Sequence, residues 1–166
     1  MKKILIFVEG ETEKKLVNSL GVVGKIQIVN LWEQPINKII PRIKEELVII
    51  IFDTDILSKI DFFKQNLQIL RKNRIKFQLI QQTNNLEGEI LRCSNCNKIQ
   101  DVFNTQGIRE FKNQWLKCQN LDKKLSDIGF QPNQLWTGKL ISTLEPWHVN
   151  CKNFKDLQLK LNSLYQ

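Results

Sequence analysis

The chain has 166 residues, of which 42% are hydrophobic and 25% are charged, and this is the composition of an ordinary globular protein. The length suffices for one domain with a full hydrophobic core, and no apolar run approaches the ~18–20 residues that a membrane-spanning helix needs. With 25 lysines and arginines against 17 acids, the formal net charge of +8 is compatible with a polyanionic partner such as nucleic acid, although lysines also serve simply for solvation.

An apolar run at residues 2–8 predicts the first strand, which ends where Glu9 and Gly10 follow. The next apolar residues recur at helical spacing, so we expect a turn and then a helix that begins near Gly10. Glu9 and Glu13 would then lie about one helical turn apart and share one face. The alternative for Glu11 and Glu13 is a purely stabilising interaction with the helix dipole.

A second apolar run, residues 47–52, is continuous rather than alternating, as expected of a parallel strand covered on both faces. Asp53 and Asp55 follow it directly, with a helix cap or turn as the alternative role for Asp53. Because the carboxyl ends of parallel strands meet at one edge of an open α/β sheet, we expect both aspartates to lie near Glu9. Converging carboxylates repel one another unless a divalent cation joins them, and oxygen donors alone suit Mg²⁺.

Further strands are predicted at residues 25–31 and 75–81, and helices at residues 35–46 and 58–73, the first of them started or kinked by Pro41. Strands and helices therefore alternate over roughly the first eighty residues. This alternation predicts an α/β fold of three layers, α/β/α, around a mainly parallel sheet of about four to five strands with right-handed crossovers.

Beyond residue 82 the pattern changes to helices and irregular segments. We expect a helix at residues 86–103, capped by Asn84 or Asn85, and another at residues 107–125. The sequence thus predicts an α/β core over residues 1–83 and a helical elaboration over residues 84–166 that completes the same compact domain.

Several residues outside the two acidic motifs are candidates for the same site. Glu87 and Glu89 follow a predicted strand end, so both are candidates for an additional metal ligand, with the helix dipole as the alternative explanation. Lys139, at the end of a short strand predicted near Trp136, is a candidate transition-state cation or else a solvated lysine. Candidate nucleic-acid contacts are Lys14, Lys59 and Arg92. The four tryptophans, Trp32 among them, could stack on bases or be buried in the core.

At residues 8–13 and 53–55 the chain resembles the TOPRIM domain, the metal-dependent catalytic module of topoisomerases, bacterial primases, ribosomal-RNA maturases and OLD-family nucleases. The first segment looks like the Glu-x-x-x-Glu opening motif of OLD-like members, and the second like the later Asp-x-Asp. The resemblance covers roughly the first half of the chain and implies a TOPRIM or Rossmann-like sheet. It also implies that Glu9 is a metal ligand or general acid/base, that Asp53 and Asp55 bind Mg²⁺ or Mn²⁺, and that Glu13 is an added ligand.

The resemblance leads us to expect a divalent-metal-dependent nuclease that cleaves phosphodiester bonds in DNA or RNA, as a toxic effector or phage-defence component. Larger OLD-type proteins carry an ATPase, so a separate ATPase or sensor protein is an expected partner. The alternative is a non-catalytic α/β module that binds a nucleotide or a partner protein, either as a receiver-like domain phosphorylated on Asp53 or as a subunit of a larger complex. A receiver-like domain needs a serine or threonine after its fourth strand, and Thr83 matches that position only weakly.

Cysteine and histidine usage argues against other chemistries. Cys93 and Cys96 form one Cys-x-x-Cys pair without a second close pair, so we expect four reduced thiols rather than a zinc ribbon. The single histidine, His148, and the absence of a Gly-x-Ser-x-Gly motif remove most support for a triad hydrolase. The first strand is not expected to be a signal peptide, because Glu9 interrupts its apolar run too soon. Together with reduced thiols, this predicts a cytoplasmic protein without membrane association.

Overall fold

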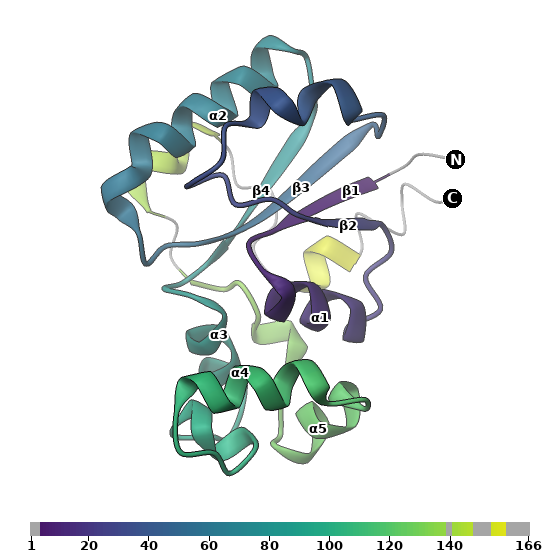
Figure 1. Cartoon of the computed structure of the whole chain (residues 1–166), viewed down its shortest axis with the longest axis vertical. Coiled ribbons are helices and arrows are strands. Elements are labelled where there is room, and N and C mark those ends of the chain that lie inside the picture. The colour runs from purple at the N-terminus through teal and green to yellow at the C-terminus, as the bar shows by residue number, and fades with distance from the viewer. Residues whose placement is uncertain (1–3, 139–140, 148–153, 159–166) are drawn as a thin grey trace.

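The computed structural model describes residues 4–138, 141–147 and 154–158. Within these residues four strands form one sheet in the spatial order β2-β1-β3-β4, and every neighbouring pair is parallel (Figure 1). The strands are β1 (Ile4–Val8), β2 (Lys25–Ile28), β3 (Leu47–Asp53) and β4 (Phe77–Gln82). The predicted α/β fold with a parallel sheet is confirmed.

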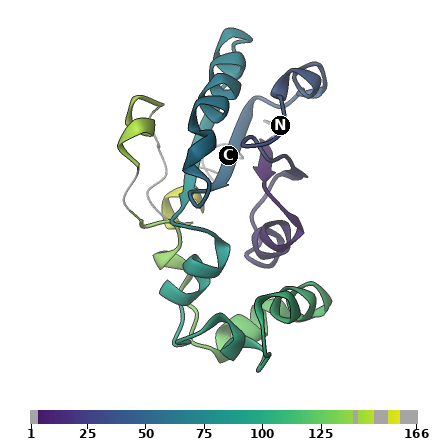
Figure 2. The same cartoon turned by 60° about the vertical axis from the view of Figure 1, so that its left-hand side comes forward.

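The helices confirm the three-layer arrangement. They are α1 (Glu11–Ser19), α2 (Ile60–Lys72), α3 (Leu86–Arg92), α4 (Ile108–Lys117) and α5 (Leu121–Asp127). Figures 1 and 2 show α2 running along the sheet, and α3, α4 and α5 gathered beyond the end of β4. No helix in the described part of the chain is long and apolar enough to cross a membrane.

Alternating side chains of the central strands build two hydrophobic cores, one on each face of the sheet. Ile6 and Ile49 point to the face covered by α1 and by the helices of the second half, whose Trp115 belongs to the same core. Phe7 and Ile50 point to the opposite face, which α2 covers. Because β1 and β3 are buried on both faces, their sequences are continuous apolar runs rather than alternating ones.

The helix predicted at residues 35–46 is wrong. The segment instead forms two 3₁₀ turns, Ile36–Lys38 and Ile40–Arg42, before the chain becomes extended at Ile43. Pro41 explains the difference, because proline has no N–H to donate to the preceding turn and disfavours the helical conformation of the residue before it.

Both long helices predicted in the second half are interrupted. The first ends at Arg92, after which the backbone C=O of Cys93 accepts from the Gln131 N–H at 2.7 Å, and a separate 3₁₀ turn follows at Ile99–Val102. Asn85 caps α3, since its side chain accepts from the Gly88 N–H at 3.0 Å. The second divides into α4 and α5 where Cys118 adopts an extended conformation.

Other short elements complete the described chain. They are the 3₁₀ turns Leu57–Lys59, Pro132–Gln134 and Ser142–Trp147, and a helical segment at residues 154–158. The strand predicted to end at residues 136–139 is wrong where it is described, because Trp136 lies in a turn with φ of 62°. Lys139, His148 and Cys151 lie outside the described residues.

Candidate active site

The acidic residues of the two motifs meet where the strand order reverses. From β1 the chain crosses to β2 on one side, and from β3 to β4 on the other, so the edge between β1 and β3 is a topological switch point, where open α/β sheets bind ligands. Glu9 follows β1 directly, and Asp53 is the last residue of β3. The Asp53 N–H donates to Glu9 Oε1 at 2.9 Å, which fixes the Glu9 carboxylate across the switch point.

Glu13 joins this edge from the first turn of α1. Its side chain is almost covered, with 7% exposed, and its Oε2 accepts from the Thr12 hydroxyl at 3.1 Å. Gly10 leaves room for it, since a Cβ at Gly10 would lie only 2.9 Å from Glu13 Oε2. Only a glycine between Glu9 and Glu13 therefore leaves the Glu13 carboxylate enough space in this position.

The loop after β3 is tied to the loop after β4. The Thr54 N–H donates to the Asn84 C=O at 2.8 Å, and the Asn84 N–H donates back to the Thr54 hydroxyl at 2.9 Å. Asp53 and Asp55 flank Thr54, and Glu87 follows Asn84 in the first turn of α3. These bonds hold the two loops beside each other, with their acids at the same edge of the sheet.

Five carboxylates thus form what we call the acidic cluster: Glu9, Glu13, Asp53, Asp55 and Glu87. Burial, together with the charges of the other four members, raises the pKa of Asp53 from 3.8 to about 9. Burial also raises the pKa of Glu9 to about 7, together with the charges of Glu13 and Asp55, against the lowering effect of its bond from Asp53. The pKa of Glu13 is raised mainly by burial. Burial and neighbouring negative charges therefore disfavour ionisation of Glu9, Glu13 and Asp53.

Lys112 is a cation of this site that the sequence did not indicate. Its ammonium lies 2.9 Å from Glu87 Oε1, and the bond to Glu87 and the charges of Glu87, Glu13 and Asp53 raise its pKa against the lowering effect of its burial. It comes from α4, so the helical elaboration supplies positive charge to an acidic edge built by the first half of the chain. Only the tertiary packing of α4 brings it there, and no local pattern around Lys112 predicts this.

Trp32 approaches the cluster from the opposite side. Its indole nitrogen is buried and forms no hydrogen bond with any described residue. The Trp32 side chain nevertheless lowers the pKa of the Glu9 carboxyl. The indole stacks on Phe63 with ring centroids 4.4 Å apart. Asn66 fixes its loop, since the Asn66 amide donates to Leu31 O at 2.8 Å. Of the two alternatives for Trp32, the structure shows burial.

The acidic cluster fits a hard divalent cation in the kind of donor it offers. Every candidate ligand is a carboxylate oxygen, the donor that Mg²⁺ and Mn²⁺ prefer. Asp53 Oδ1 is buried without a hydrogen-bond partner among the described residues, and a cation would satisfy it. No group of three acidic, histidine or cysteine side chains in the described ranges stands ready to hold an ion, so binding requires the carboxylates to move together.

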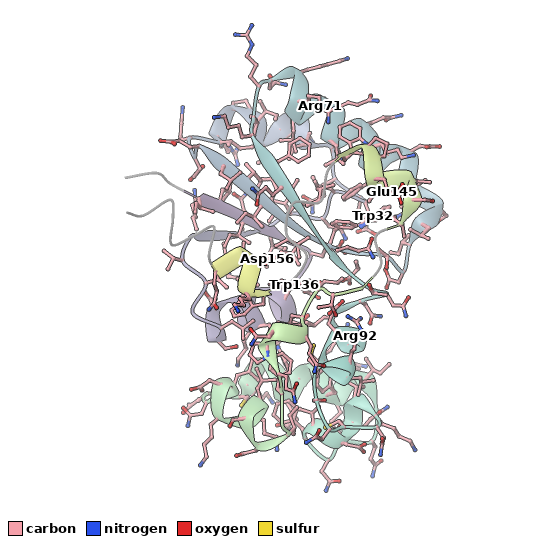
Figure 3. The ribbon with its side chains drawn as sticks, turned by 180° about the vertical axis from the view of Figure 1, so that it is seen from behind. Trp32, Arg71, Arg92, Trp136, Glu145 and Asp156 are labelled. Carbon is pink, nitrogen blue, oxygen red and sulfur yellow. The ribbon has the colours of Figure 1, made fainter. Side chains whose placement is uncertain are left out.

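Other candidate residues have partners within the protein. Glu89, fully buried, accepts from the Thr83 and Trp136 N–H groups at 2.8 and 2.9 Å, and from both terminal nitrogens of Arg92 at 2.9 and 3.1 Å. Figure 3 shows Arg92 where the sheet meets the helices of the second half. Glu89 thus joins the end of β4, α3 and the turn at Trp136, and Arg92 neutralises its charge.

The two candidate lysines for nucleic-acid binding are exposed or half-buried and form surface ion pairs. The Lys14 ammonium lies 3.6 Å from Glu11, and that of Lys59 lies 3.4 Å from Glu33. Such exposed pairs are weak, typically up to about 1 kcal/mol, so either lysine can exchange its carboxylate for a phosphate.

Three of the four cysteines lie in the described part of the chain. The three that are described, Cys93, Cys96 and Cys118, are free thiols. Burial raises the pKa of the Cys93 thiol to about 12, which makes it unreactive.

Comparison of the chain with protein-family models, with curated proteins and with solved structures finds no match. The case for a function therefore depends on the geometry of the site and on the motifs at its two strand ends.

Proposed function

We propose that this protein is a divalent-metal-dependent nuclease that cleaves phosphodiester bonds in DNA or RNA at the acidic cluster. The observation that carries the proposal is the gathering of partly buried, mutually repelling carboxylates, Glu9, Glu13 and Asp53, at the topological switch point. Without a bound cation, this arrangement lowers the stability of the folded protein. Cation binding therefore explains the presence of these carboxylates better than a role in stability does. The resemblance to TOPRIM domains supports the same assignment.

Glu9, Glu13, Asp53, Asp55 and Glu87 would hold Mg²⁺ or Mn²⁺, which when bound supplies Lewis-acid stabilisation of charge on phosphate oxygens. Glu9 is the best-placed proton acceptor or donor, because Oε1 is fixed by the Asp53 N–H and a pKa of about 7 lets the carboxyl change protonation near neutrality. Lys112 joins Lys139 as a candidate transition-state cation, since its ammonium can move from Glu87 to a substrate phosphate.

The same reasoning supports three proposals about context. The resemblance to OLD-type proteins supports a toxic or phage-defence role with a separate ATPase or sensor protein as partner. The net charge of +8 supports nucleic acid as the substrate. The free thiols support a cytoplasmic location.

The test combines two isosteric variants with a matched control. Plasmid DNA, single-stranded DNA and structured RNA are incubated with the wild type, Glu9→Gln and Asp53→Asn in Mg²⁺ or Mn²⁺ and in chelator. Glu46→Gln is the control, because Glu46 is an exposed acid at the opposite end of β3. We expect cleavage by the wild type and the control only, and only with metal.

Two results would contradict the proposal. Cleavage that persists in Glu9→Gln and Asp53→Asn would come from a contaminant or from another site. Metal binding by the wild type without cleavage of any of the three substrates would favour the alternative of a non-catalytic α/β module.

A further inference from the structure

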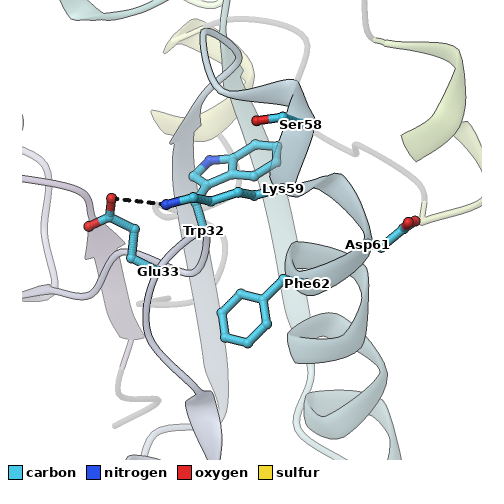
Figure 4. Close-up of a pocket in the computed structure, with 6 residues that line it drawn as sticks. All are labelled: Trp32, Glu33, Ser58, Lys59, Asp61 and Phe62. Carbon is cyan, nitrogen blue, oxygen red and sulfur yellow. Dashed lines mark hydrogen bonds and ion pairs between the residues drawn. The ribbon is translucent and has the colours of Figure 1, made fainter.

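A pocket of about 450 Å³ opens among the segments that follow the carboxyl ends of β2 and β3, on the face of the sheet that α2 covers (Figure 4). The segment after β2 contributes Trp32 and Glu33, and the segment between β3 and the first turn of α2 contributes the remaining residues. These are Ser58, Lys59, Asp61 and Phe62. The pocket is large enough for one planar heterocycle and is open to solvent.

The apolar lining is aromatic. The Trp32 indole closes the bottom of the pocket but is only 1% exposed, stacked on Phe63 and held in place through Asn66, so it supports the pocket rather than stacking on a ligand. The Phe62 ring is half-buried and keeps a surface free for a ligand. Figure 4 shows the Lys59 side chain passing the indole, with its ammonium directed at Glu33. A flat ring is the ligand shape that these surfaces fit.

Two carboxylates against one ammonium make the rim net negative, so the pocket favours a neutral ligand over an anion. Lys59 is paired with Glu33 at 3.4 Å, and Asp61 adds a further negative charge at the pocket. A phosphate would meet two carboxylates and one ammonium that already has a partner. Carboxylate oxygens and the Ser58 hydroxyl instead accept hydrogen bonds from ring N–H and amino groups. The ligand chemistry indicated is a neutral aromatic ring that carries N–H donors.

Trp32 connects this pocket to the acidic cluster. One part of its indole lines the pocket, and the ring also packs against Phe52 with centroids 6.3 Å apart, where Phe52 directly precedes Asp53 at the end of β3. A ring held in the pocket is therefore next to the edge where a phosphate would meet the cluster. Base and phosphate are joined through one sugar in every nucleotide, so a single nucleotide unit can occupy both places.

We infer that this pocket holds an unpaired nucleobase next to the scissile phosphate, and that the substrate is therefore single-stranded at the cut. This inference rests on the proposed nuclease function for the phosphate but on the pocket alone for the base. A paired base cannot enter, because its hydrogen-bonding edge and both of its faces are already engaged in the duplex.

The test measures binding in chelator, where cleavage cannot occur, by fluorescence anisotropy of a short end-labelled single-stranded DNA and of the same strand with its bases removed. The wild type should bind the complete strand about tenfold more tightly than the abasic strand. Phe62→Ala and Ser58→Leu should abolish that difference, the first by removing the stacking surface and the second by filling the pocket. Lys64→Ala, on the same helix but outside the pocket, should retain it.

Equal binding of both strands by the wild type, or no binding of either, would overturn the inference, and so would a base preference that survives in both pocket variants. The outcome is separable from that of the proposed function. If the wild type prefers the complete strand but never cleaves in metal, the base pocket stands and the nuclease proposal fails. If it cleaves with metal but binds both strands equally, the nuclease proposal stands and the pocket fails.

Discussion

Asp53→Asn should stabilise the metal-free protein at alkaline pH. The carboxyl of Asp53 is the most strongly perturbed member of the acidic cluster, because burial and four neighbouring carboxylates raise its pKa from 3.8 to about 9. The substitution keeps the shape of the side chain and removes its charge. It should therefore relieve a repulsion that the wild type bears once the pH is high enough to ionise the cluster.

The direction and size follow from proton binding. The folded protein holds a proton on Asp53 that the unfolded chain has released, so between about pH 4 and pH 9 the folded state binds more protons and the free energy of unfolding falls as the pH rises. One pKa unit corresponds to about 1.4 kcal/mol, so the shift from 3.8 to about 9 amounts to about 7 kcal/mol. The side chain is partly exposed and screened by water and salt, so we expect a gain of about 2 kcal/mol at about pH 8.

Urea denaturation in chelator, from about pH 5 to about pH 9, measures this effect. The wild type and the Glu46→Gln control should lose stability across that range, whereas Asp53→Asn should lose less. Mg²⁺ at about a hundred times its dissociation constant should stabilise the wild type by about 2.7 kcal/mol and Asp53→Asn much less. A metal-free Asp53→Asn that is less stable than the wild type at about pH 8 would refute the repulsion on which the site assignment depends.

Three further substitutions test other parts of the structure. Lys112→Met should tighten Mn²⁺ binding in calorimetry, because the ammonium no longer competes for Glu87, while cleavage slows about tenfold; unchanged metal affinity would contradict this. Glu89→Ala should lower the free energy of unfolding by about 3–5 kcal/mol in urea, because Arg92 and two buried N–H groups lose their acceptor; a loss below about 1 kcal/mol would contradict this. Asn66→Ala should cost about 2–4 kcal/mol by the same measurement, since three backbone groups lose their partner, and an unchanged near-ultraviolet spectrum of the tryptophans would argue against its role in fixing their loop.

The part of the site that depends on local pattern could be predicted from the sequence. Glu9 and Asp53 follow apolar runs whose continuity identifies buried parallel strands, and parallel strands necessarily end at one edge. Lys112 and Trp32 could not be placed, because their approach to the cluster depends on how α4 and the segment after β2 pack. Pro41 shows the opposite case, because its effect on the backbone is local and overrides the helical spacing of the apolar residues around it.

The bond from the Trp115 indole N–H to the Thr12 C=O, at 3.1 Å, joins α4 to the first turn of α1. Thr12 precedes Glu13, so a residue that is translated after the whole sheet helps to hold in place an acid of the first helix. On the ribosome the early acids emerge without this support and without Lys112, and the site acquires its final geometry only after α4 has left the exit tunnel and docked. Under the proposed nuclease function, this order would keep the growing polypeptide inactive beside the messenger RNA and ribosomal RNA that surround it.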